Sequence, residues 1–126
     1  MSFTTVGHCG NDHAAWLKSI EFYEGEFDIL KARLLEIAGK NSGTEVSQQV
    51  EHFQNQFIVQ RNNIDVLKQH IHEHDGKVSK EALAHSGKMD TAFVHQHQDL
   101  KEEFDSKEKV INGLRHEFNQ FLSKWM

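Results

Sequence analysis

Residues 68–76, KQHIHEHDG, place three histidines, a glutamate and an aspartate within six consecutive positions. Imidazole nitrogens are ligands for Zn²⁺, Cu²⁺, Ni²⁺ and Fe²⁺, and two histidines four residues apart on a helix can bind one ion from one face. His70 and His74 have that spacing. Histidines are also common at helix C-termini, where the partial negative charge favours the protonated form. A metal site, a pH-sensitive contact and a solvated helix end are therefore all compatible with this stretch, and its surroundings must decide.

The composition is that of a single soluble domain. The chain has 126 residues, 14 Lys plus Arg against 19 Asp plus Glu, and a formal net charge of −5. Charges of both signs are interspersed, which argues against a surface for nucleic acid or anionic membrane, because such surfaces need clustered basic residues. No apolar run approaches the roughly 20 residues that span a bilayer. We expect one domain over residues 1–126, with residues 1–11 as a flexible N-terminal segment.

The N-terminal residues and the cysteine content bear on location. The first residues lack the basic and apolar regions of a secretory signal. Cys9 is the one cysteine, so no intramolecular disulfide can form, and a reducing compartment is favoured. We therefore expect a cytoplasmic protein.

Three stretches carry apolar residues at spacings that alternate between three and four, as in the core positions of a helical bundle. They predict helices over residues 12–38, 44–75 and 90–125, with a short connector helix near 79–85. Gly39 and the sequence Asp75-Gly76 provide the expected stops, and Asp90 the expected N-cap of the third helix. Short connections make successive helices antiparallel. The expected fold is an all-α, coiled-coil-like antiparallel three-helix bundle.

A four-helix bundle with a break near residues 104–107 is the alternative fold. Asp105, with Glu108 three residues later, resembles a capping box that would start a new helix. Against this, the core spacing continues through Phe104, Lys107 and Ile111 without interruption, whereas a chain reversal normally shifts the phase. The sequence therefore favours three helices.

The relative register of the helices decides which residues meet. If Trp125 lies level with Val46, then His97 of the third helix lies beside His13 and His74, with His70 on the same side. These four histidines, His13, His70, His74 and His97, are the candidate ligands for a zinc or iron ion. In the other register Phe121, Trp125 and Met126 overhang the bundle, and such an apolar patch would drive dimerisation or partner binding.

The sequence gives little support to any of the active sites known in helical bundles. A ferritin-type di-iron site needs Glu-x-x-His motifs, and the sequence contains none. A hemerythrin-type site would combine His52 with His70, which lie about 27 Å apart along one helix. Cys9 beside His8 and His13 lacks an identifiable orienting group for a nucleophile. We therefore expect no enzymatic activity.

The segments VEHFQNQFIVQRNNIDVLKQ and EFNQFLSKWM resemble those of a family of short, uncharacterised bacterial helical proteins. The resemblance covers most of residues 12–126 and implies an all-helical fold without implying a function. The expected function is thus that of a non-enzymatic interaction or structural module that binds a protein partner or a second copy and needs no cofactor. The alternative is a small metal-binding protein that uses the four histidines.

Overall fold

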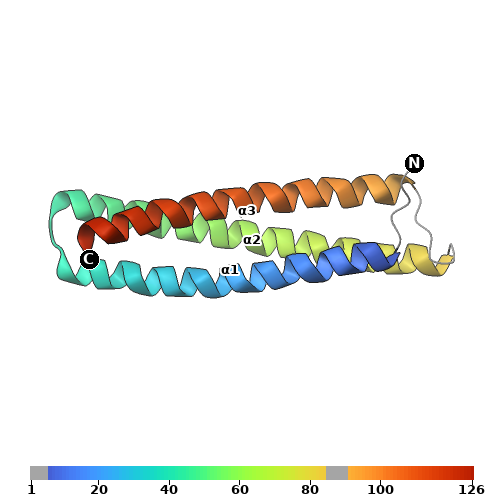
Figure 1. Ribbon diagram of the computed structural model, residues 1–126, viewed down its shortest axis with the longest axis horizontal. Coiled ribbons are helices and arrows are strands. Elements are labelled where there is room, and N and C mark those ends of the chain that lie inside the picture. Colours follow the sequence, from blue (N-terminus) through green and yellow to red (C-terminus); the bar gives the residue numbers. More distant parts are fainter. Residues whose placement is uncertain (1–5, 85–90) are drawn as a thin grey trace.

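The computed structural model describes residues 6–84 and 91–126, which form three long helices (Figure 1). These are α1 (Val6–Lys40), α2 (Thr44–Ala84) and α3 (Thr91–Trp125), and no strand occurs among the described residues. α2 runs back along α1, and α3 lies beside both in the direction of α1 (Figure 1). The predicted all-α three-helix bundle is confirmed. The alternative break near residues 104–107 is wrong, because α3 is continuous there.

Most of the core consists of residues at the three-and-four spacing seen in the sequence, and Cys9 and Val78 lie outside the predicted helices. Along each helix, buried side chains recur at three- and four-residue intervals, so that one face of the helix points inward. The largest fully buried side chains are those of Phe118, Ile20, Ile37, Ile64, Leu67 and Ile71. Gln60 interrupts this apolar series, since it is buried and its Oε1 has no hydrogen-bond partner among the described residues.

The two helices whose ends lie nearest the histidines, α1 and α2, extend beyond their predicted ends there. α1 begins at Val6. Residues 6–11, which were expected to be part of a flexible N-terminal segment, are therefore helical. The expected stop at Asp75-Gly76 and the separate connector helix near 79–85 are also wrong, because α2 continues to Ala84. Residue 85 and the expected cap Asp90 lie outside the described residues.

Burial of Val78 explains why α2 continues through Gly76. A glycine inside a helix costs about 1 kcal/mol, whereas burying a valine side chain contributes about 1.5 kcal/mol or more. Val78 is 2% exposed and packs with Cys9 of the lengthened α1. The Ser79 hydroxyl also donates a hydrogen bond to the backbone carbonyl of Asp75, at 3.1 Å. The tertiary contact therefore outweighs the local preference of glycine.

Polar contacts at the far end of the bundle show the register of α3 relative to α2. The indole Nε1 of Trp125 donates to Gln49 Oε1 at 3.1 Å, and Lys124 Nζ lies 3.0 Å from Glu45 Oε1. Trp125 is thus level with the start of α2 and half-buried. The register in which the C-terminal aromatics overhang the bundle is wrong, and the observed one brings His97 to the level of His13 and His74.

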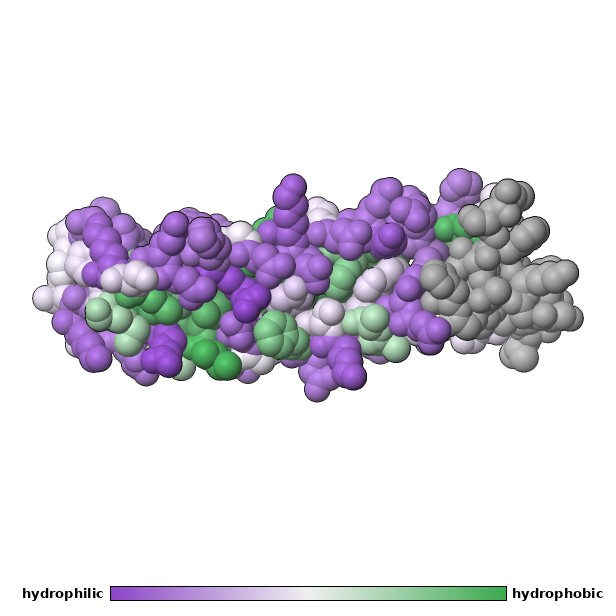
Figure 2. Space-filling model, viewed as in Figure 1, coloured by the Kyte–Doolittle hydropathy of each residue, from purple (hydrophilic) through white to green (hydrophobic). Residues whose placement is uncertain are grey.

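The outer surface is mostly polar. Figure 2 shows hydrophilic residues over most of the visible face, broken by apolar patches along α1. In the described part of the chain, none of the helices combines the length and apolarity that crossing a membrane requires.

Candidate metal centre

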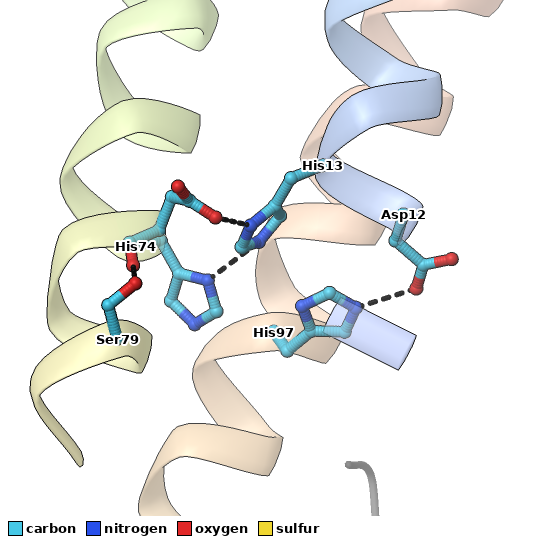
Figure 3. A network of polar contacts seen from close by, with 6 residues as sticks. Asp12, His13, His74, Ser79 and His97 are labelled. Carbon is cyan, nitrogen blue, oxygen red and sulfur yellow. Dashed lines mark hydrogen bonds and ion pairs between the residues drawn. The ribbon is translucent and has the colours of Figure 1, made fainter. Parts of the chain in front are cut away.

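Three histidines from three helices meet at the end of the bundle where α1 and α3 begin. His13, His74 and His97 are 2%, 7% and 5% exposed, and one ring nitrogen from each lies within 4.8 Å of the others. Figure 3 shows the three rings drawn together between α1, α2 and α3. We call these residues the histidine triad.

The helical repeat places each ring in the core. Every triad residue occupies a core position between apolar neighbours three or four residues away, so the bundle buries it as it would a leucine. These neighbours are Cys9 and Trp16 on α1, Ile71 and Val78 on α2, and Phe93 and Leu100 on α3. The indole of Trp16 stacks on His97, with ring centroids 5.1 Å apart and planes 25° from parallel. Apolar side chains therefore shield the triad on both sides along the bundle axis.

Two aspartates orient two of the rings. His13 Nδ1 donates to Asp75 Oδ1 at 2.7 Å, and His97 Nε2 donates to Asp12 Oδ2 at 2.7 Å (Figure 3). A carboxylate on one ring nitrogen keeps the proton there and leaves the other nitrogen with a lone pair. Histidines that bind metals usually have such a partner, which also makes the free nitrogen a stronger donor. The nitrogens that these two aspartates leave unengaged by a carboxylate are His13 Nε2 and His97 Nδ1.

The third ring completes this arrangement. His74 Nδ1 lies 3.0 Å from His13 Nε2. When all three rings are neutral, Asp75 holds the His13 proton on Nδ1, so Nε2 accepts and His74 Nδ1 must donate. His74 Nε2 then carries a lone pair, and this atom is buried without a hydrogen-bond partner among the described residues. A buried lone pair of this kind is costly to leave unmatched and is suited to a cation.

The triad environment also keeps His74 neutral. Burial lowers its pKa from the ordinary 6.5 to about 4, reinforced by the charged forms of His13 and His97, while the backbone carbonyl of Phe93 acts in the opposite direction. Neutral imidazole is the form that binds transition metals. At pH 7 the ring is therefore ready to bind an ion without first losing a proton.

A tetrahedral zinc site sets the separations that the triad nitrogens would have to reach. Zinc–nitrogen bonds of about 2.0–2.1 Å put tetrahedral donors about 3.3 Å apart. One ring nitrogen from each triad residue lies within 4.8 Å of the others, and His74 would have to release its 3.0 Å hydrogen bond to His13 Nε2 for both rings to bind one ion. Three protein ligands leave a fourth position for water or another group.

The fourth predicted ligand, His70, lies outside the triad. Its ring is exposed, and Nδ1 lies 2.9 Å from Glu103 Oε1 on α3. The sequence predicted Asp75 only as part of a helix stop, and neither Asp75 nor Asp12 was expected to contact a histidine. Both are adjacent in sequence to a core histidine, but neither binds that neighbour, since consecutive helical residues point about 100° apart. Each instead reaches a histidine on another helix, which the sequence spacing alone does not indicate.

Cys9 lies one helical turn before His13 and is fully buried. Burial raises the pKa of its thiol to about 11, with Asp12 and Asp75 adding to the effect. The thiol is thus protonated at neutral pH, which disfavours a role as a nucleophile. Comparison with known proteins adds no assignment to this geometry: no family model, no curated protein and no solved structure matches the chain.

Proposed function

We propose that this protein binds a divalent transition-metal ion, zinc in the first instance or iron, at the histidine triad. The observation that carries the proposal is the convergence of three buried imidazoles from three helices, with ligand nitrogens within 4.8 Å of one another. Two further features support it. Two of the rings have carboxylate partners, and the third has a buried lone pair without a partner among the described residues.

A metal at this position would tie the three helices together. Each ligand comes from a different helix, so the complete site exists only when the bundle is folded. An ion that binds only the folded state stabilises it by about 2.7 kcal/mol at a hundred times its dissociation constant. For a domain of this size, that corresponds to an increase of about 10 °C in melting temperature.

Thermal melts at pH 7.5 with EDTA and with added Zn²⁺ or Fe²⁺, together with elemental analysis, test the proposal. We expect one ion per chain and an EDTA-sensitive melting temperature. His74→Ala should abolish both, because it removes a ligand. His72→Ala, which changes an exposed histidine on the same helix, should leave both unchanged.

The circular dichroism of metal-free His74→Ala shows whether this variant still forms the bundle. A wild-type protein that contains no metal, with a melting temperature indifferent to EDTA and to both ions, would overturn the proposal.

Association with a protein partner or a second copy is a second candidate function, favoured by one groove. This groove, of about 570 Å³ between α1 and α2, is lined largely by apolar side chains, among them Phe27, Leu34, Leu35, Val50, Phe57 and Ile58. Leu35 and Ile58 are 59% and 56% exposed there. Adjacent exposed apolar side chains of this kind mark interaction surfaces.

Sedimentation equilibrium tests whether two copies associate through this groove. We expect a dimer that the double substitution Leu35→Glu and Ile58→Glu converts to a monomer, because the charges would be buried at the interface. Val110→Glu, at an exposed valine on α3, is the matched control. A wild-type protein that stays monomeric over the accessible concentration range would contradict self-association.

A further inference from the structure

The histidine triad is bounded by three interfaces between helices, two of which a carboxylate closes. Asp75 of α2 bonds His13 of α1, and Asp12 of α1 bonds His97 of α3. The third interface, between α2 and α3, instead contains a groove of about 250 Å³. His74 is one of the residues that line it. The groove therefore leads from the surface to one ligand of the triad.

The lining of this groove is suited to cations. Glu73, Asp99 and Glu103 contribute three carboxylates, against one lysine, Lys77. A cleft lined by one sign of charge concentrates counter-ions and raises the rate at which they arrive. Carboxylates outside a complete ligand set hold a transition metal less tightly than clustered imidazoles, so an ion gathered here can move on.

The acidic lining of the groove and the buried nitrogen of His74 are separate observations that indicate the same kind of ligand, a cation. His74 is 7% exposed, and its Nε2 has no hydrogen-bond partner among the described residues. A cation drawn in by the carboxylates would thus meet an imidazole with an available lone pair. His70 lies on the way, bridging to Glu103 at 2.9 Å across the two helices.

We propose that the groove between α2 and α3 is the port through which a divalent cation enters and leaves the histidine triad, with Glu73, Asp99 and Glu103 gathering it at the mouth. This inference rests on the proposed metal-binding function. It also gives His70 a place at the port rather than in the ligand set.

Obstruction of the groove provides the first test. Gln96 is exposed and lines the groove, so Gln96→Phe would fill it, whereas Gln98→Phe adds the same bulk outside the lining. Loading with Co²⁺ and release to EDTA can be followed by stopped-flow fluorescence of Trp16, which stacks on His97. A Trp125→Phe background removes the other tryptophan. We expect Gln96→Phe to slow loading and release by the same factor and to leave the affinity unchanged, with Gln98→Phe like the background protein.

Charge removal at the mouth is the second test. The triple variant Glu73→Gln, Asp99→Asn and Glu103→Gln should load Co²⁺ about tenfold more slowly at low ionic strength. The difference should shrink in high salt, which screens the exposed carboxylates. A control with Glu36→Gln, Glu51→Gln and Asp65→Asn removes the same number of carboxylates farther along the bundle and should load at the background rate.

The outcomes separate the port from the binding site itself. Normal Co²⁺ affinity with unchanged rates in both groove variants would overturn the port and leave the proposed function intact. No Co²⁺ or Zn²⁺ binding by the wild-type protein would overturn the function and the port together. Metal-free melts of each variant establish that the bundle is folded before the rates are compared.

Discussion

Acidifying the metal-free protein from pH 7.5 to pH 4 should lower its free energy of unfolding by about 3 kcal/mol through His74. The pKa of His74 is lowered from 6.5 to about 4 in the folded chain. Between these values the unfolded chain binds a proton that the folded chain excludes. The stability present above about pH 6.5 is therefore lost as the pH falls toward 4.

The surroundings of His74 explain why protonation is unfavourable. His13 on α1 and His97 on α3 face it, and Lys77 lies one turn away on α2, while Asp75 and Asp12 are engaged by the other two rings. A positive charge on His74 would be buried among these rings without a carboxylate of its own. The cost of desolvation dominates, as it does for most buried imidazoles.

Urea unfolding in EDTA-containing buffer, repeated at several pH values, measures the effect. Carboxylates begin to protonate near the acidic end of this range, so the informative quantity is the difference between the wild type and His74→Gln. The variant should lose less stability between pH 6.5 and 4, whereas His72→Gln, at an exposed site, should follow the wild type. Parallel pH dependences for the wild type and His74→Gln would contradict the assignment.

The sequence placed His13, His74 and His97 at one level of the bundle core, where the structure brings them together, and the reason is geometric. His13, His74 and His97 continue the three-and-four spacing of the apolar residues. Each therefore lies on the same buried face of its helix as a core neighbour such as Trp16 or Ile71. The same geometry places His70 outside the triad. His70 lies one residue before the core residue Ile71, which is about 100° around the helix from it. That rotation moves it from the core to the flank, where it is exposed and contacts Glu103.

The misplaced helix ends have one common cause that local sequence does not reveal. The extra turns of α1 bring Cys9 into the core, and the extra turns of α2 bring Val78 against it, with Phe93 and Val94 of α3 packed alongside. Each extension buries the other. Glycine at positions 7, 10 and 76 signals a break in the sequence, but the contact that overrides it joins residues nearly seventy positions apart. Helix propensity is a local quantity and is outweighed by such packing.

Phe118→Ala should cost about 3–5 kcal/mol of the free energy of unfolding, because it opens a cavity in the middle of an aromatic cluster. Phe118 is 0% exposed, and its ring lies 5.1 Å from that of Phe53, 5.2 Å from Phe57 and 5.8 Å from Phe121. Domains of this size are typically stable by only about 5–15 kcal/mol, so the urea midpoint should fall sharply.

Phe22→Ala is the matched control for Phe118→Ala, since Phe22 is 55% exposed. Phe22→Ala should lower the free energy of unfolding by less than about 1 kcal/mol. Equal decreases in the two variants would contradict the prediction that Phe118 packs in the core and Phe22 does not. Phe118 lies 21 residues from His97 along α3, too far to share a contact with the triad. Effects at well-separated sites add, so zinc should stabilise folded Phe118→Ala by the same increment as the wild type. If zinc instead stabilised Phe118→Ala by less than the wild type, the geometry of the triad would depend on packing throughout the bundle.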